Sequence, residues 1–154
     1  GAVYVADRNN HRILRRGPGE AVAEVVWGLK GRGDDLDQLC EPCGVAVGPN
    51  GSVYVADYGN QRVLHKRLGE ALAEVVFGGN GVGKDLDQLY YPYGVAVGPD
   101  GAVYVADTHN HRVLCKGPGE ALAVVLLGGK GQDDDLDRLD KPSGVAVGPD
   151  GAVY

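Results

Sequence analysis

Short apolar runs alternate with glycine-rich turns along this chain. Within residues 94–143, four such runs lie at 94–97, 103–106, 112–116 and 121–127. They are rich in residues found in strands, and the Gly-Pro-Asp-Gly between the first two has the chemistry of a tight turn. The third run alternates polar and apolar residues, as a half-exposed strand does. The pattern therefore predicts four short strands in an antiparallel meander, with the first strand, apolar on both faces, innermost.

The same pattern recurs every 50 residues. The phrase Gly-Ala/Ser-Val-Tyr begins at Gly1, Gly51, Gly101 and Gly151 without a shift. A period of about 20 to 50 residues is typical of solenoids, propellers and arrays. A single four-stranded sheet cannot bury both of its faces, so neighbouring sheets must cover it. The sequence therefore predicts an all-β fold made of β-propeller blades that pack radially.

We expect the blades at approximately residues 1–43 (lacking its first strand), 44–93 and 94–143, with 144–154 as the start of the next blade. Closed propellers have about four to eight blades, so about three should form an open half-ring. Either further blades or a second copy of the chain must then cover its ends. Because both ends fall inside the repeated phrase and no methionine is present, we interpret the sequence as a piece of a longer protein.

One long motif recurs in this pattern. The run P-x-G-V-A-V-x-P-[D/N]-G-x-V-Y-V-A-D-x-x-N-x-R-[V/I] is found at residues 42–63 and 92–113, and a linker from Gly79 through Gln88-Leu89 precedes the second copy. In these residues the chain resembles the NHL repeat family. The resemblance covers essentially the whole chain.

The resemblance implies a segment of a propeller that is typically six-bladed. NHL domains bind proteins, RNA or small ligands, often beside a separate effector domain, and a few relatives are metal-dependent lyases. The leading interpretation is a non-catalytic scaffold that binds a protein partner. The alternatives are an RNA-binding NHL domain of a ubiquitin-ligase-type protein, and a metal-dependent lyase or hydrolase propeller. The RNA interpretation would use basic side chains as phosphate contacts, namely Arg12, Arg15, Arg16, Lys66, Arg67 and Lys116.

Composition restricts the partners further. The 154 residues carry a net charge of −6, whereas nucleic-acid binders usually present a basic face, so a nucleic acid is disfavoured. No apolar run approaches the roughly 18 residues of a membrane helix, so no membrane partner is expected. Three cysteines form no paired framework, which favours a reducing compartment such as the cytoplasm.

Each copy also carries a D-x-x-N-x-R set that looks catalytic in isolation. Its recurrence favours a structural role, because one active site does not need three copies. Asp and Asn are suited to bracing a turn, and Arg donates several hydrogen bonds from one plane. The set comprises Asp7, Asn10 and Arg12; Asp57, Asn60 and Arg62; and Asp107, Asn110 and Arg112.

The most informative differences among the copies fall on one face. Alternate connections of a meander emerge on the same side, so the second-to-third turns share a face with the long linkers between blades. The copies diverge there, and loops on a rigid scaffold commonly carry function. The alternative is that these loops have drifted without selection. We expect this face to contact a ligand through Arg8, Asn9, Tyr58, Thr108, His109, Tyr90, Tyr91 and Tyr93.

Neither a catalytic residue nor a cofactor is expected. Cys40 and Cys43 have the spacing of a metal or redox pair, but the chain has no second pair, so they are interpreted as reduced thiols. An acidic run suggests calcium, but it lacks the EF-hand order of ligands and is interpreted as a solvated loop. That run is Asp133, Asp134, Asp135 and Asp137.

Overall fold

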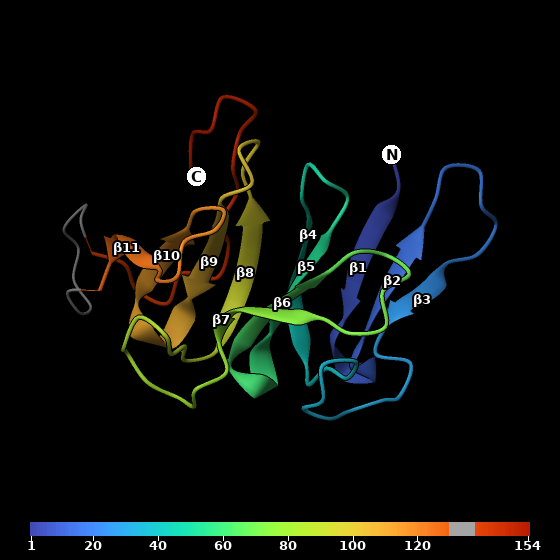
Figure 1. The fold of residues 1–154 in the computed structure, drawn as a ribbon, viewed down its shortest axis with the longest axis horizontal. Coiled ribbons are helices and arrows are strands. Elements are labelled where there is room, and N and C mark those ends of the chain that lie inside the picture. Colours follow the sequence, from blue (N-terminus) through green and yellow to red (C-terminus); the bar gives the residue numbers. More distant parts are fainter. Residues whose placement is uncertain (130–137) are drawn as a thin grey trace.

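The computed structural model describes residues 1–129 and 138–154, and the acidic run at residues 133–137 lies outside them. The described residues form three antiparallel sheets, which lie side by side in Figure 1. The first sheet contains β1 (Val3–Asp7), β2 (Arg12–Arg16) and β3 (Glu24–Trp27). The second contains β4 (Pro42–Val47), β5 (Val53–Asp57), β6 (Arg62–Lys66) and β7 (Glu74–Gly78). The third contains β8 (Pro92–Val97), β9 (Val103–Asp107), β10 (Arg112–Lys116) and β11 (Val124–Gly128).

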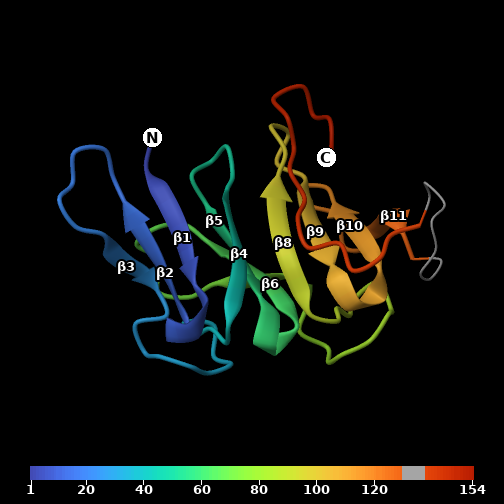
Figure 2. The same ribbon diagram turned by 180° about the vertical axis from the view of Figure 1, so that it is seen from behind.

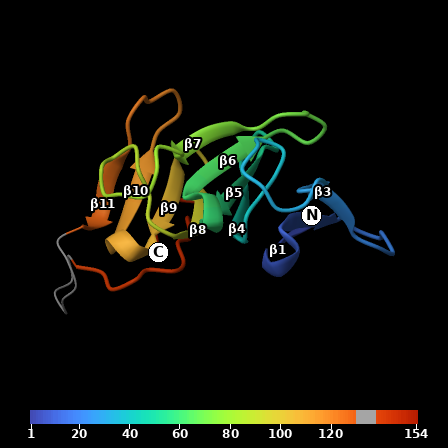
Figure 3. The same ribbon diagram turned by 90° about the horizontal axis from the view of Figure 1, so that it is seen from below.

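Within each sheet the strands follow one another in chain order, so each sheet is a meander. The three sheets are arranged as an open half-ring. Seen from below, β1, β4 and β8 lie toward the centre, whereas β3, β7 and β11 lie at the periphery (Figure 3). The expected all-β fold of propeller blades is confirmed, with the apolar first strand innermost in both four-stranded sheets.

The hydrophobic core lies between neighbouring sheets and not within one sheet. Between the first and second sheets, Ile13 and Trp27 pack in one cluster with Val55 and Leu64. Between the second and third sheets, an equivalent cluster contains Phe77 with Val105 and Leu114. Because each cluster is shared by two sheets, the fold depends on the stacking of repeats.

The second and third strands of each repeat are joined by a short 3₁₀ turn. These turns are η1 (Arg8–Asn10), η2 (Tyr58–Asn60) and η3 (Thr108–Asn110). They lie at the lower edge of the molecule in Figure 1, together with the linkers 28–41 and 78–91. We call this edge the linker face; the opposite edge, seen again from behind in Figure 2, carries the first-to-second turns.

One expectation about exposure was wrong. The third strand of the repeat was expected to be half-exposed, but Arg112, Val113 and Leu114 at the start of β10 are all buried. Arg112 is covered because the linker 78–91 passes over it and accepts its hydrogen bonds. In the described part of the chain, no helix is long and apolar enough to cross a membrane.

Candidate interaction surface

In the second and third repeats, the Asp and Arg of the D-x-x-N-x-R motif are buried beneath the linker face. The Asp57 carboxylate accepts hydrogen bonds from Asn60 Nδ2 (2.8 Å), Arg62 Nε (2.8 Å) and the backbone N–H of Cys40 (2.7 Å). Arg62 also donates to the carbonyl oxygen of Asp34 (2.7 Å). These contacts hold the linker 28–41 against the second sheet, which is what a structural role for the motif requires.

The third repeat uses the same contacts. Asp107 accepts from Asn110, from Arg112 and from the backbone N–H of Tyr90, at 2.7 to 2.8 Å. Arg112 donates to the carbonyl of Lys84 at 2.7 Å. The backbone that carries the tyrosines of the second linker is therefore fixed to the third sheet.

The ionisation of the clusters depends on their burial. Asp7 is partly exposed, and the hydrogen bond from Arg12 lowers the pKa of its carboxyl. Burial raises the pKa of Asp57 and of Asp107, although the N–H donors around each one favour the charged form. Ionised Asp7 therefore stabilises the fold above its ordinary pKa, and this contribution is lost as the pH falls through the lowered value. For Asp57 and Asp107 the effect on stability is reversed: ionisation of the buried carboxyl destabilises the fold, and this destabilisation is removed as the pH falls and the carboxyl is protonated.

A second recurring contact joins each turn to the following blade. The backbone N–H of Glu41 donates to His11 Nδ1 at 3.0 Å, and that of Tyr91 donates to Gln61 Oε1. Both members of each pair have a positive φ between 50° and 55°. This conformation is uncommon for residues with a side chain, and the hydrogen bond between the two members of each pair holds both in it. The pair thereby fixes the direction in which the linker enters the next sheet.

Five aromatic side chains form a continuous row on the linker face. Tyr58 stacks on Tyr91 with ring centroids 4.7 Å apart, and Tyr93 meets Tyr58 edge-on at 6.2 Å. Tyr90 lies 5.0 Å from Tyr91, and His109 lies 5.0 Å from Tyr90 and 4.9 Å from Tyr91. We call these residues the aromatic row. They come from a turn of the second sheet, the second linker with the start of β8, and a turn of the third sheet.

Arg8 extends the row toward the first sheet. Its guanidinium lies over the Tyr58 ring at 4.6 Å and bonds to the Glu41 carboxylate at 2.9 Å. This hydrogen bond lowers the pKa of Glu41. The ion pair therefore holds the cation against the aromatic surface.

The two remaining residues expected at the site differ in position. Asn9 is exposed. Thr108 is only 8% exposed and donates to the carbonyl of Pro142 at 2.8 Å. Thr108 therefore lies beneath the surface and holds the chain that follows the third sheet.

A hollow lies beside the aromatic row, and sequence reasoning missed it. It measures about 670 Å³, and its lining includes Tyr90, His109, Lys84 and Arg112. It occupies the space between the second linker and the turn of the third sheet. The row therefore borders a concave surface.

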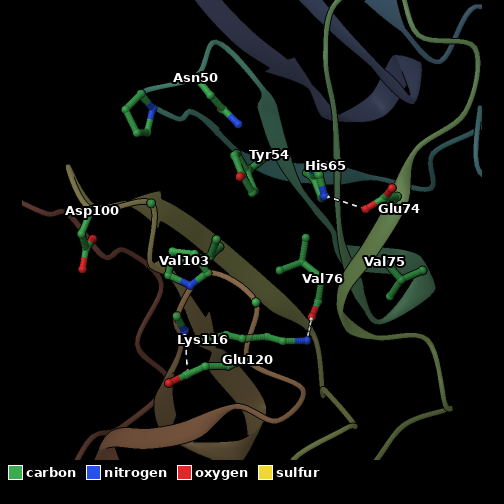
Figure 4. Close-up of a pocket in the computed structure, with 15 residues that line it drawn as sticks. Asn50, Tyr54, His65, Glu74, Val75, Val76, Asp100, Val103, Lys116 and Glu120 are labelled. Atoms are coloured by element: carbon green, nitrogen blue, oxygen red, sulfur yellow. Dashed lines mark hydrogen bonds and ion pairs between the residues drawn. The ribbon is translucent and has the colours of Figure 1, made fainter.

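Another hollow, of about 490 Å³, opens on the opposite face between the second and third sheets (Figure 4). There His65 Nε2 lies 3.2 Å from Glu74, and the His65 ring stacks on Tyr54 at 5.2 Å. Lys116 donates to the carbonyl of Val76 at 3.1 Å. Sequence reasoning missed this hollow as well.

The junction between the first and second sheets differs from this one in the contact made by its lysine. There the Lys66 ammonium lies over the Trp27 ring at 4.7 Å. The next repeat has the smaller Phe77 at the position of Trp27. The replacement of Trp by Phe is the feature of the sequence from which this difference in the lysine contact could have been predicted.

The cysteines are free thiols. Cys40 is buried, and the Cys43 thiol donates to the carbonyl of Glu41 at 3.4 Å. Burial raises the pKa of Cys43 and of Cys115, which makes these thiols less reactive. Among the described residues, no group of three or more His, Cys, Asp or Glu side chains is placed to hold a metal ion.

The fold and the stacked repeats define a segment of a β-propeller. It resembles an auxiliary nutrient binding protein from Bacteroides thetaiotaomicron (TM-score 0.69, 16% identity, 97% of this chain and 41% of that one). It also resembles a chain of the nidogen/laminin complex (TM-score 0.66, 15% identity, 96% of this chain and 49% of that one). A third similar structure is virginiamycin B lyase from Staphylococcus aureus (TM-score 0.66, 16% identity, 100% of this chain and 44% of that one). The chain thus spans less than half the length of these structures, and at such identities they show the fold alone.

Residues 39–65 and 89–115 match the NHL repeat. Two segments of the chain therefore carry the NHL repeat. A search of curated proteins found no match.

Proposed function

We propose that this chain is a non-catalytic NHL propeller scaffold that binds a protein partner through its linker face. The observation that carries the proposal is the aromatic row, in which five side chains from three separate segments converge. Tyrosine provides a broad apolar area with a hydrogen-bonding tip, and it is enriched at the centres of protein interfaces. The hydrogen bonds beneath the row support this role.

Those hydrogen bonds reduce the entropy lost on binding. The backbone N–H of His109 donates to the carbonyl of Tyr90 at 3.0 Å, and the N–H of Tyr90 donates to Asp107. Neighbouring rings further limit the rotamers of Tyr58 and Tyr91. A surface that is already ordered loses less conformational freedom when a partner docks.

The RNA-binding alternative has less support. Several of the basic side chains that would contact phosphates have partners within the chain: Arg12 bonds to Asp7, and Lys66 is buried over Trp27. Binding of single-stranded RNA that weakens steeply with added salt would favour this alternative, and no binding at low salt would reject it.

The lyase alternative is favoured by one observation, the likeness in fold to virginiamycin B lyase. Elemental analysis of the purified chain would distinguish it from a scaffold. Stoichiometric zinc or calcium would support a metal-dependent enzyme, whereas its absence would reject that class.

The scaffold proposal is tested with a peptide library displayed on phage and selected on the wild-type chain. Selected peptides are then measured by calorimetry against the triple variant Tyr90→Asp, Tyr91→Lys and Tyr93→Ser. The third repeat has these residues at the matching positions 140, 141 and 143, so the backbone tolerates them. We expect the triple variant to bind selected peptides at least about tenfold more weakly.

A matched control changes the opposite face. Asn50→Asp and Ser52→Ala also exchange residues between repeats, since the third repeat has Asp100 and Ala102. Peptide affinity should be unchanged in this control. Peptides that bind the triple variant as tightly as the wild type, or a selection that enriches no peptide, would contradict the proposal.

A further inference from the structure

The hollow of about 490 Å³ between the second and third sheets lies on the face opposite the linker face (Figure 4). Tyr54, His65 and Glu74 of the second sheet line one side of it, and Val103 and the segment 116–120 of the third sheet line the other. Ligand-binding pockets are usually concave, with apolar walls and a few polar groups that fix the orientation of the ligand. The polar groups of this hollow therefore define which ligand it can hold.

The first sheet shows how the same positions of the repeat hold a cation. Arg15 lies opposite Tyr4 on one side and opposite Glu24 on the other. Its guanidinium bonds to the Glu24 carboxylate at 2.9 Å and to the Glu20 carboxylate at 3.3 Å. The stem of an arginine packs along apolar surface while its charged end stays hydrated. In the first sheet, therefore, the chain itself provides the cation for these acceptors.

The second sheet keeps these neighbours but has His65 at the position of Arg15. Tyr54 and Glu74 lie opposite His65 in the same register. The imidazole stacks on the Tyr54 ring at 5.2 Å, and its Nε2 lies 3.2 Å from Glu74. It is shorter than an arginine side chain and carries no permanent charge. Tyr54 is only 8% exposed, and none of the described residues forms a hydrogen bond with its hydroxyl.

The hollow follows from smaller side chains at this junction. It is lined by His65, Gly117 and Pro118, whereas the matching residues at the first junction are Arg15, Arg67 and Leu68. Two of these three replacements also remove a cation. The space and the missing positive charge therefore arise from the same differences between the repeats.

The lining of the hollow has an excess of negative charge. Among the described residues that line it, the carboxylates are those of Glu74, Asp100 and Glu120. The lysine of the lining, Lys116, already donates to the Val76 carbonyl at 3.1 Å. A guanidinium group is positively charged and only donates hydrogen bonds, so it matches both the charge and the acceptors of this lining.

We propose that the hollow binds a guanidinium group on an alkyl stem, in the way that the first sheet holds the side chain of Arg15. The guanidinium bonds to the Glu74 carboxylate and to the Tyr54 hydroxyl, and the stem lies against Val103 and Pro118. A free alkylguanidine and an arginine side chain of another protein present this same group. The proposal does not depend on partner binding at the linker face.

Titration of the wild-type chain with butylguanidinium, followed by NMR, tests the proposal. The ring signals of Tyr54 and His65 should shift and reach saturation. Pentanol and butyrate have a similar length without the cation, and both should shift these signals far less. A Gly-Arg-Gly peptide with blocked ends distinguishes the two sources of the ligand. If it shifts the same signals, the hollow accepts the arginine side chain of a protein; if only butylguanidinium does, the hollow takes the free compound.

Two variants test the residues of the site. His65→Arg introduces the residue of the first repeat, so the chain's own guanidinium should fill the hollow and binding of butylguanidinium should be lost. The first repeat has arginine between the same neighbours, so the fold should persist. Glu74→Gln should weaken binding by a factor of about three to five, as expected for an exposed ion pair. Glu24→Gln is the matched control in the first repeat and should leave the affinity unchanged.

Three results would overturn the proposal. The first is a titration in which butylguanidinium gives no saturable shift, or no larger shift than pentanol or butyrate. The second is binding to folded His65→Arg that is as tight as to the wild type. The third is an equal effect of Glu74→Gln and Glu24→Gln, and this comparison tests the site independently of His65→Arg.

Discussion

At the residue scale, one motif occurs in two environments. Asp57 and Arg62 have side chains that are 0% and 9% exposed, and the linker 28–41 passes over them. Asp7 and Arg12 make the same 2.8 Å contact, but their side chains are 23% and 39% exposed. The contribution of this ion pair to stability should depend on its burial, although the sequence of the motif is the same. Solvent screens the exposed pair. A buried charge that loses its partner, by contrast, finds no water to replace it.

Arg62→Ala should destabilise the fold far more than Arg12→Ala. The first change leaves the Asp57 carboxylate buried with one charged partner removed and frees the linker carbonyls, at a cost of about 3 to 5 kcal/mol. The second should cost about 0 to 1 kcal/mol, since it breaks a half-exposed pair. Urea unfolding at one fixed protein concentration would measure both values. An equal decrease in the free energy of unfolding in the two variants would contradict a role of burial.

At the scale of the elements, the turn and the linker act together. His11, Gln61 and His111 each close a 3₁₀ turn in a left-handed conformation, with φ of 54° or 55°. Each side chain also accepts a hydrogen bond from the backbone N–H of a residue 30 positions later. The turn of one sheet thus positions the start of the next, and His and Gln are suited to this position because both carry an acceptor at the required reach.

Gln61→Ala should therefore cost about 1 to 3 kcal/mol, because the part-buried N–H of Tyr91 loses its acceptor. Gln61→His should be tolerated, since the first and third repeats have histidine at this position. Thermal unfolding of the two variants would measure the difference. If Gln61→His destabilised as much as Gln61→Ala, the hydrogen bond would not be the cause.

The strands and their order could be predicted from the sequence because each is short, apolar and bounded by glycine-rich turns. Residues 92–116 illustrate this, since the strands there begin and end within two residues of the apolar runs. The burial of Arg112 could not be predicted, because it depends on carbonyls of a linker 24 to 28 residues earlier in the chain. The stacking of Tyr58 on Tyr91 likewise depends on how two segments approach in space, which no local pattern encodes.

At the scale of the whole molecule, stability should decrease from the middle of the half-ring toward its ends. The second sheet is covered on both faces, and every residue of β5 is buried. In β1 of the first sheet, by contrast, Val3 and Val5 are mostly or half exposed. Regions with fewer buried apolar contacts open locally at a lower free energy than the global unfolding. The first sheet should therefore open before the second.

Hydrogen exchange can test this gradient with an internal reference. β1, β5 and β9 all have the sequence Val-Tyr-Val-Ala-Asp, so exchange rates at matching central positions differ chiefly through structure. We expect the Val5 amide to exchange about tenfold or more faster than those of Val55 and Val105 at dilute protein concentration. Equal rates for the three strands in dilute solution would contradict the gradient, since they would require the exposed strand to be as well protected as the one in the centre of the core.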